Sequence, residues 1–371
     1  MSDAPKRICI ILGTRPEAIK LAPVIQAFQQ APDFQTQVVL TGQHREMVDQ
    51  VMTLFDLSAS EDLAIMQPKQ SLTNITCLTL QGLESYFSRS QPDLVIVQGD
   101  TTTAFAAALA AFYQKIPVGH VEAGLRTDNL YSPFPEEANR RLISQLTTLH
   151  FAPTDTSVKH LERSGVVGAI HQTGNTVIDA LLKVAERQPA CPIPGLEWDR
   201  YRVLLATVHR RENWGDPLRD IAQGFLTILD KFPDTALLLP LHRNPTVRDP
   251  LQALLGENPR VFLTEPLDYA QLVGAMQRCY LLLTDSGGLQ EEAPGLGKPV
   301  LVMRDTTERP EAIEAGTARL IGTSVDSIVH NASELLRDAT AYETMAKAVN
   351  PFGDGQASAR IVKIVRSYLN L

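Results

Sequence analysis

Cysteine is scarce in this sequence of 371 residues: four cysteines lie far apart and form no CxxC pair. This spacing, with no supporting histidines, argues against a structural zinc site and predicts free, buried thiols. Long apolar runs are also lacking, since none approaches the ~20 residues that a membrane-spanning helix needs. The five apolar residues before Gly13 are too few for the core of a signal peptide. We therefore expect a cytoplasmic protein without a membrane segment.

The sequence also lacks an excess of positive charge. It has 42 acidic and 34 basic residues, for a net charge of -8. This balance argues against a general nucleic-acid-binding protein, so any anion site must be local. A chain of this length is longer than one hydrophobic core usually supports, which predicts two domains.

Short β-branched apolar runs are present, and they alternate with longer helix-like segments. The runs lie at 7–13, 37–42, 93–100, 118–124 and 150–154, and then at 202–209, 236–242, 260–265, 280–285 and 299–303. Runs that are apolar on both faces and separated by helices are typical of parallel sheets covered on both sides. The sequence therefore predicts an α/β protein with two doubly wound units.

A proline-rich segment at 186–202 separates the two sets of runs. It carries three prolines and one glycine, which is typical of a linker. We therefore predict a first domain at 1–185 and a second at 200–354. The end of the chain, 355–371, carries an apolar helical stripe and should dock on another part of the protein.

Ligands of parallel α/β sheets collect at the carboxyl ends of the strands. The loop after the first run, GTRPEAIK, offers Arg15 and Lys20 for a phosphate group. Its lone Gly13 does not match GxGxxG, which argues against NAD or FAD. A capped helix with solvated cations is the alternative interpretation.

Three carboxylates follow other predicted strands of the first half. Asp100 and Glu122 lie at strand ends, and Glu136 opens a helix together with Glu137. Asp100 could simply cap a helix, and the glutamate pair could complement a helix dipole. Three such acids at one sheet edge instead suggest general acid and base groups.

Histidine and arginine follow two strands of the second half. His209 precedes Arg210, and His242 precedes Arg243. One strand-end histidine is usually structural, but two His-Arg pairs favour an anion site.

The stretch TDSGGLQEEAPGLGKPVLV combines glycines with two adjacent glutamates. Ser286, Gly287 and Gly288 can present backbone N–H groups to a diphosphate, and Glu292 can accept hydrogen bonds from ribose hydroxyls. Arg309, after the next strand, can also contact the phosphates. These residues predict a nucleoside diphosphate as the ligand.

Several motifs in a fixed order extend this interpretation to nearly the whole chain. They are GTRPEAIK, TGQHREM, GDTTT, HVEAGLRT, YSPFPEEANR, TGNTVIDAL, HRREN, DSGGLQEEAPGLGKPVLVMRDTTERPE and NPFGDGQA. In this order and spacing, they resemble the bacterial non-hydrolysing UDP-N-acetylglucosamine 2-epimerases. The resemblance implies a GT-B-like fold, with two doubly wound Rossmann-like domains facing each other across a cleft and a C-terminal helix that returns to the first domain.

The resemblance also implies a reaction and its partners. UDP-GlcNAc and UDP-ManNAc would interconvert by elimination of UDP to 2-acetamidoglucal and re-addition to the other face. No cofactor and no metal are implied, although a second UDP-GlcNAc molecule can act as an allosteric activator. We expect a homodimer that binds neither nucleic acid nor membranes.

The resemblance assigns roles residue by residue. The proton-transfer set is Asp100, Glu122 and Glu136, while His209 stabilises or protonates the departing diphosphate. Substrate contacts are expected from Arg15, Lys20, Ser286, Gly287, Gly288, Glu292 and Arg309. The regulatory nucleotide sugar would contact Gln43, Gln70, Arg210 and His242.

Three other functions remain compatible with the same nucleotide site. A hydrolysing epimerase would release ManNAc and UDP. A GT-B glycosyltransferase would require an acceptor, and a nucleotide-sugar sensor would show no turnover.

Overall fold

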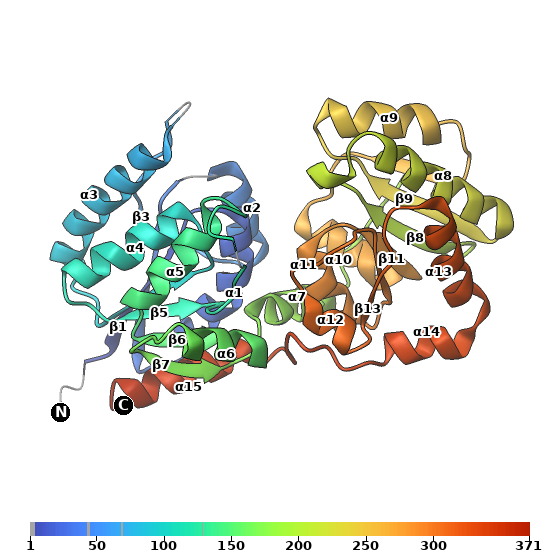
Figure 1. Cartoon of the computed structure of the whole chain (residues 1–371). Coiled ribbons are helices and arrows are strands. Elements are labelled where there is room, and N and C mark those ends of the chain that lie inside the picture. The colour runs from blue at the N-terminus through green and yellow to red at the C-terminus, as the bar shows by residue number, and fades with distance from the viewer. Residues whose placement is uncertain (1–3, 43–44, 68–69, 128) are drawn as a thin grey trace. The chain divides into compact units, whose positions relative to one another are not determined.

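The computed structural model describes residues 4–42, 45–67, 70–127 and 129–371 (Figure 1). The chain forms two compact units. Unit 1 comprises Met1–Ala180 and Phe352–Leu371, and unit 2 comprises Leu181–Pro351. The chain thus crosses between the units at 180–181 and again at 351–352. The first crossing lies inside helix α7 (Thr176–Glu186), ahead of the proline-rich segment, which belongs to unit 2.

Unit 1 is built on a sheet of parallel strands in the order β3-β2-β1-β4-β5-β6-β7. The apolar runs predicted in the first half all form strands, whereas β3 and β7 were not predicted because they are short, polar edge strands. The strands are β1 (Lys6–Leu12), β2 (Phe34–Leu40), β3 (Glu61–Asp62), β4 (Leu94–Gln98), β5 (Val118–Val121), β6 (Leu149–Ala152) and β7 (Ala169–Gln172). Because β1 pairs with both β2 and β4, the sheet is doubly wound as predicted.

Helices surround the sheet of unit 1 (Figure 1). They are α1 (Arg15–Gln29), α2 (Arg45–Leu54), α3 (Leu72–Ser90), α4 (Thr102–Tyr113), α5 (Glu136–Leu146), α6 (Asp155–Arg163), α7 and α15 (Ala357–Tyr368). The Thr101 hydroxyl caps α4 by accepting from the N–H of Ala104. The alanines of α4 then allow close packing on the sheet and on α3.

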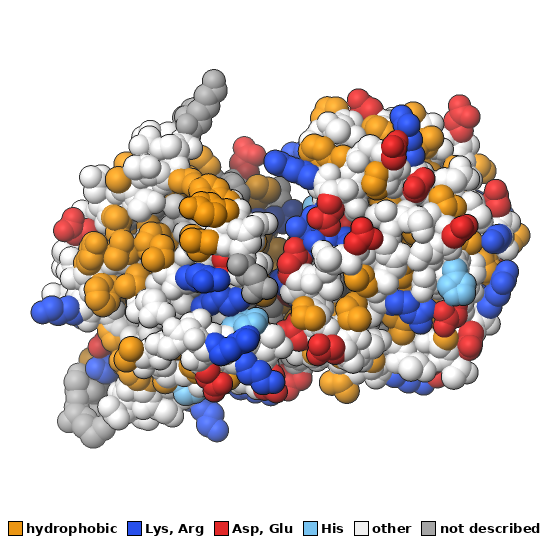
Figure 2. Space-filling model, viewed as in Figure 1, with side chains coloured by type: hydrophobic (Ala, Val, Ile, Leu, Met, Phe, Trp, Pro, Cys, Tyr) orange, Lys and Arg blue, Asp and Glu red, His pale blue; other side chains and the backbone are white. Residues whose placement is uncertain are grey.

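Helices α3, α4 and α5 form a layer with an apolar outer surface. Phe105, Leu109 and Phe112 are spaced along one side of α4, and Phe112 is 54% exposed. Leu142 of the adjacent α5 is 48% exposed. Hydrophobic side chains gather over these helices in Figure 2. An exposed patch of this kind marks a candidate interaction surface.

The C-terminal helix α15 packs against α1 within unit 1. Arg366 of α15 pairs with Asp33, with its Nε and Nη2 atoms 2.5 and 2.9 Å from the two carboxylate oxygens. At its other end, α15 begins with the N–H groups of Ala357 and Ser358 donating to the Asp179 carboxylate of α7. The apolar stripe of this segment is therefore docked.

Unit 2 contains a second parallel sheet, in the order β10-β9-β8-β11-β12-β13. Its strands are β8 (Arg202–Thr207), β9 (Thr235–Pro240), β10 (Val261–Thr264), β11 (Leu281–Thr284), β12 (Val300–Val302) and β13 (Ala318–Leu320). Only β13, a short edge strand, was absent from the predicted runs. The prediction of two doubly wound parallel-sheet units is thereby confirmed.

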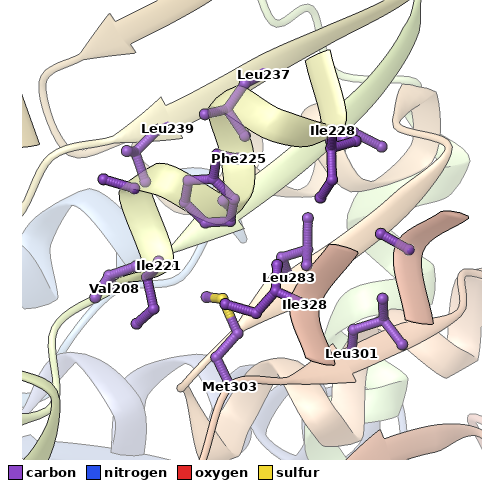
Figure 3. Packing of buried hydrophobic residues seen from close by; sticks show 14 of the residues in the cluster. Val208, Ile221, Phe225, Ile228, Leu237, Leu239, Leu283, Leu301, Met303 and Ile328 are labelled. Carbon is purple, nitrogen blue, oxygen red and sulfur yellow. The ribbon is translucent and has the colours of Figure 1, made fainter. Parts of the chain in front are cut away.

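Helices cover the sheet of unit 2 and complete its core. They are η1 (Arg211–Asn213), α8 (Asp216–Lys231), α9 (Pro245–Leu255), α10 (Tyr269–Arg278), α11 (Gly287–Glu292), η2 (Ala293–Leu296), α12 (Pro310–Glu314), α13 (Val325–Arg337) and α14 (Ala339–Ala346). Phe225 of α8, Ile328 of α13 and Leu283 of β11 meet in one buried cluster (Figure 3). Of the helices in the described ranges, none has both the length and the apolar character to cross a membrane.

Two buried histidines are paired in register on β5 and β6 of unit 1. The Nε2–H of His120 donates to the carbonyl oxygen of Gly99 at 2.7 Å and so supports the turn before Asp100. Neither ring nitrogen of His150 has a hydrogen-bond partner among the described residues. Burial lowers the pKa of His120 to about 4 and that of His150 to about 3.

We expect the free energy of unfolding to fall as the pH drops below 6.5, the ordinary histidine value. Below pH 6.5 these histidines are protonated in the unfolded chain, but in the folded chain they stay neutral until the pH reaches their lowered pKa values. Each histidine therefore lowers the free energy of unfolding by ~2 kcal/mol between pH 6.5 and 5. His150→Leu should remove about that much of the loss in urea unfolding followed by circular dichroism. His330→Leu, at an exposed position of α13, is the control. Equal pH dependence in His150→Leu and the wild type would contradict this.

Candidate active site

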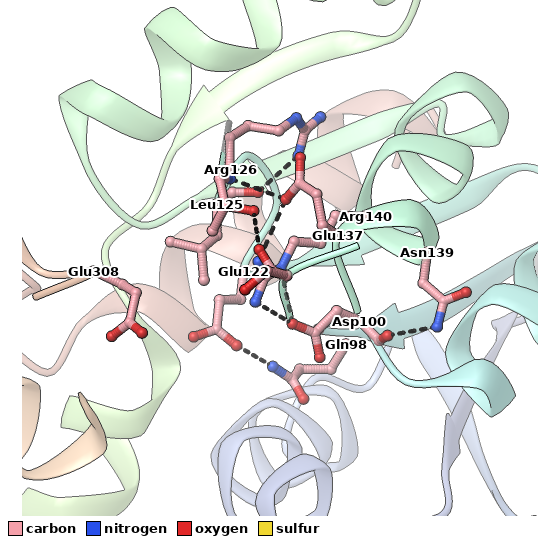
Figure 4. A network of polar contacts seen from close by, with 12 residues as sticks. Gln98, Asp100, Glu122, Leu125, Arg126, Glu137, Asn139, Arg140 and Glu308 are labelled. Carbon is pink, nitrogen blue, oxygen red and sulfur yellow. Dashed lines mark hydrogen bonds and ion pairs between the residues drawn. The ribbon is translucent and has the colours of Figure 1, made fainter. Parts of the chain in front are cut away.

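Three loops of unit 1 meet at the carboxyl edge of its sheet because β1, β4 and β5 are neighbours. Lys20 lies on α1, which follows β1. Asp100 follows β4, and Glu122 follows β5 directly. Figure 4 shows Asp100 and Glu122 within one network of polar contacts.

Glu122 is held from several directions. Its backbone is left-handed, with φ of +63°, a conformation that non-glycine residues rarely adopt and that often occurs at functional sites. Lys20 Nζ lies 2.5 and 2.7 Å from the two carboxylate oxygens. Gln98 Nε2 donates to Oε2, and Asn175 Nδ2 donates to Oε1 at 3.2 Å. Lys20, predicted as a substrate contact, therefore also neutralises and orients this carboxylate.

Asp100 is oriented by α5. Arg140 directs Nε and Nη2 at Oδ2, at 2.8 and 2.7 Å, and Asn139 Nδ2 donates to the Asp100 carbonyl oxygen at 2.9 Å. The side chain of Asp100 remains 26% exposed. The carboxylate is thus fixed in direction and still accessible.

The two adjacent glutamates at the start of α5 have different environments. Glu137 is fully buried and accepts hydrogen bonds from the Thr127 N–H at 3.0 Å and from Arg141 Nε at 2.7 Å. Glu136 is half-buried, and its Oε2 atom has no hydrogen-bond partner among the described residues. This difference supports a structural role for Glu137 and leaves Glu136 as the candidate reactive acid.

The loop between β1 and α1 is organised by Glu17. Its Oε2 atom accepts from the N–H groups of Gly13 and Thr14 at 2.8 and 2.7 Å, and its Oε1 atom accepts from the Thr101 hydroxyl. Burial is the largest influence and raises the pKa of this carboxyl group. Arg15, the first residue of α1, is half-buried and has no ion-pair partner in the described part of the chain.

In unit 2, the neighbouring strands β8 and β11 bring His209 and Asp285 together. Asp285 is buried, and its Oδ1 atom lies 2.7 Å from His209 Nδ1. Its Oδ2 atom accepts from the N–H groups of His209 and Arg210 at 2.9 and 2.8 Å, and from Asn213 Nδ2 at 3.1 Å. Burial opposes ionisation, but these donors outweigh it and lower the pKa of Asp285. The buried carboxylate thus orients an imidazole that is 38% exposed.

The glycine-containing turn lies directly after this aspartate. The Ser286 N–H donates to the Thr284 hydroxyl at 2.9 Å, and α11 begins at Gly287. A Cβ atom on Gly287 would lie 3.6 Å from Arg210 Nη2, and one on Gly288 would lie 3.7 Å from Glu292 Oε1. The nucleotide contacts predicted on this turn, from Ser286 to Glu292, therefore belong to one compact segment.

Arg309 is paired with the buried Glu291, one residue before Glu292. The buried Arg304 forms two ion pairs: its Nε atom lies 2.5 Å from Glu212 Oε1, and its Nη1 atom lies 2.8 Å from Glu308 Oε2. Burial opposes ionisation of Glu308, but the Arg304 hydrogen bonds and the charges of Arg304 and Arg210 lower its pKa to about 2. These pairs connect the loops after β8 and β12.

The predicted regulatory residues are spread over both units. Gln70 belongs to unit 1, where Nε2 donates to the Ile65 carbonyl oxygen at 2.6 Å. His242 of unit 2 is exposed, and its ring centroid lies 6.4 Å from that of His209. Gln43 lies outside the described residues.

Several supporting residues were not predicted from the sequence: Gln98, Arg140, Asn175 and Asp285. A signal existed for Gln98 and Asp285, since each stands at the end of an apolar run. Arg140 lies in α5 and Asn175 just before α7, so neither stands at the end of an apolar run. In the described ranges, no three His, Cys, Asp or Glu side chains group as metal ligands.

Comparison with known proteins gives a consistent picture. A family model described as UDP-N-acetylglucosamine 2-epimerase matches residues 26–366. A probable UDP-N-acetylglucosamine 2-epimerase from Ralstonia nicotianae is 51% identical over 373 residues, which cover 98% of this chain and 99% of that protein.

Two solved structures are similar over nearly the same length. UDP-GlcNAc 2-epimerase from Neisseria meningitidis, bound to UDP-GlcNAc, has 48% identity and a TM-score of 0.88, covering 97% of this chain and 100% of its own. MnaA from S. aureus, in complex with UDP, has 43% identity and a TM-score of 0.89, and the match covers 99% of this chain and 97% of the MnaA chain. The similarity therefore includes both units.

Proposed function

Since this chain belongs to the UDP-N-acetylglucosamine 2-epimerase family, we propose that it interconverts UDP-GlcNAc and UDP-ManNAc reversibly without releasing free sugar. The observation that carries the proposal is the carboxyl edge of unit 1, where Glu122 and Asp100 are each fixed by cationic partners. With Glu136, they form a set of acids suited to removing a proton at C2 and returning one to the opposite face.

The proposed route is elimination followed by re-addition. A carboxylate takes the C2 proton, the bond between C1 and the phosphate oxygen breaks, and the electron pair forms a C1=C2 double bond. UDP then adds back at C1 while C2 is protonated from the other face. The net reaction neither oxidises nor reduces the sugar, so no NAD is required.

Unit 2 would bind and stabilise the UDP leaving group. The N–H groups of Ser286, Gly287 and Gly288, together with Arg309, would contact the diphosphate, and Glu292 would bind the ribose. His209, oriented by Asp285, would meet the negative charge that develops as the C1–O bond breaks. We propose that these groups replace a metal ion as the partner of the diphosphate.

Nuclear magnetic resonance of the sugar nucleotides tests this function. Pure protein with UDP-GlcNAc and EDTA, without NAD, should form UDP-ManNAc at constant total nucleotide sugar. Formation of free ManNAc and UDP would indicate a hydrolysing epimerase. Release of UDP only when an acceptor is present would indicate a glycosyltransferase, and an unchanged UDP-GlcNAc spectrum would indicate a sensor. A sigmoidal dependence of the initial rate on UDP-GlcNAc would support the proposed second nucleotide sugar at Arg210 and His242.

We also propose that the protein is a homodimer joined through the apolar surface of α3, α4 and α5. Burying this surface against a second copy would remove Phe112 and Leu142 from water, which favours association. Light scattering should give about twice the 40.8 kDa of one chain, and Phe112→Asp should shift the mass towards the monomer. A monomeric wild type at working concentration would contradict the dimer.

A further inference from the structure

Asn175 is a buried residue of unit 1 that has no role in the reaction described above. The residue is 2% exposed, and its Nδ2 atom donates to Oε1 of Glu122 at 3.2 Å. Its Oδ1 atom accepts the N–H of Val177 at 3.1 Å. Because a backbone N–H can only donate, the amide oxygen must face Val177 and the NH₂ group must face Glu122.

The backbone of Asn175 is fixed by the returning end of the chain. Its N–H donates to the carbonyl oxygen of Phe352 at 2.6 Å. The contact is close, because a Cβ atom on Gly353 would lie 3.4 Å from the Asn175 nitrogen. Asp179, in the first turn of α7, also holds the start of α15. Asn175 therefore lies where both crossings of the chain between the units are fastened to unit 1.

The donors around Glu122 are divided between its two oxygens. Gln98 donates to Oε2, Asn175 donates to Oε1, and Lys20 contacts both. The terminal torsion of a glutamate is broad, so a carboxylate held on one side alone can rotate. A fixed amide on Oε1, opposite the fixed amide on Oε2, limits this rotation.

We propose that Asn175 is a positioning residue that holds the Glu122 carboxylate in the orientation needed for proton transfer at C2. The inference rests on the proposed epimerase function. It assigns a task to the TGNTVIDAL motif and makes the segment around Phe352 part of the support for the reacting acid. Asn175 itself does not exchange a proton with the substrate.

Asn175→Ala should lower kcat roughly tenfold or more, the scale of a lost hydrogen bond to a charged group. The KM for UDP-GlcNAc should stay within about twofold, because most of the expected UDP contacts lie in unit 2, from Ser286 to Arg309. Both constants are measured by following UDP-ManNAc formation, and a thermal melt reports whether the variant is folded.

Asn175→Asp is the sharper variant because it keeps the oxygen that accepts from Val177. The introduced carboxyl group faces Glu122, so the two acids share one proton at low pH, and the shared proton restores the missing donor. At higher pH this shared proton is lost and the two carboxylates repel each other. We expect near-normal kcat at low pH and a fall of roughly tenfold at higher pH, a limb that the wild type lacks.

Asn331→Asp serves as the matched control. Asn331 is an amide on α13 that donates to the Ser327 carbonyl oxygen at 2.8 Å, far along the chain from the carboxyl edge of unit 1. Its pH profile should match that of the wild type. A wild type that epimerises, with wild-type pH profiles for Asn175→Asp and unchanged kcat for Asn175→Ala, would overturn this inference alone. A wild type without turnover would instead overturn the proposed function.

Discussion

Replacing Glu122 with glutamine is expected to lower kcat by ~10²-fold or more while UDP binding largely survives. The amide preserves the size of the side chain but cannot take a proton. Because most of the expected UDP contacts lie in unit 2, the change should appear in turnover rather than in affinity. Asp100→Asn should behave in the same way. Turnover is measured by nuclear magnetic resonance and UDP affinity by calorimetry.

A control must separate lost chemistry from a lost ion pair, since Glu122 is also the partner of Lys20. Asp33→Asn supplies it, because Asp33 of the same unit pairs with Arg366 at 2.5 and 2.9 Å. This variant should retain wild-type kcat. Near-normal turnover of both Glu122→Gln and Asp100→Asn would return these acids to structural and helix-capping roles.

Asp285→Asn should also reduce kcat by ~10²-fold or more. The amide oxygen can replace Oδ2 as acceptor for the backbone N–H groups of His209 and Arg210. The amide NH₂ group would then face Nδ1 of His209, which must become an acceptor and can no longer carry a proton there. An imidazole that cannot become cationic loses its effect on the departing diphosphate.

Asp234→Asn is the matched control for this change in unit 2. Asp234 forms a bidentate ion pair with Arg202, whose Nε and Nη2 atoms lie 2.7 and 3.1 Å from the two carboxylate oxygens, away from the His209 loop. Its loss should leave kcat unchanged, although stability can fall. A near-normal kcat for Asp285→Asn would mean that the orientation of His209 does not matter for turnover.

The sheets could be predicted because their strands are apolar on both faces. Each predicted run formed a strand, whereas β3, β7 and β13 were not predicted because their short sequences ED, AIHQ and ARL contain polar residues and form no apolar run. The positions of Asp100 and Glu122 also followed from sequence, since residues at the ends of neighbouring parallel strands share one edge.

The partners of these acids could not be predicted in the same way. Arg140 reaches Asp100 from one turn inside α5, and Asn175 reaches Glu122 from the position just before α7. Such contacts depend on where each helix packs on its sheet, and no local pattern encodes that placement. The different fates of Glu136 and Glu137 have the same origin, because only packing decides which of two adjacent acids is buried.

The elimination route is the central claim, and a labelled reaction in D₂O tests it most directly. UDP-GlcNAc with ¹⁸O in the bridge between C1 and the β-phosphate is incubated with the protein, and the nucleotide sugars are analysed by nuclear magnetic resonance and mass spectrometry. Elimination predicts deuterium at C2 of the UDP-ManNAc formed. It also predicts movement of ¹⁸O into non-bridging phosphate positions, because UDP is free of the sugar while the glycal exists. Epimerised product that retains its C2 hydrogen, with the ¹⁸O still in the bridge, would contradict the account.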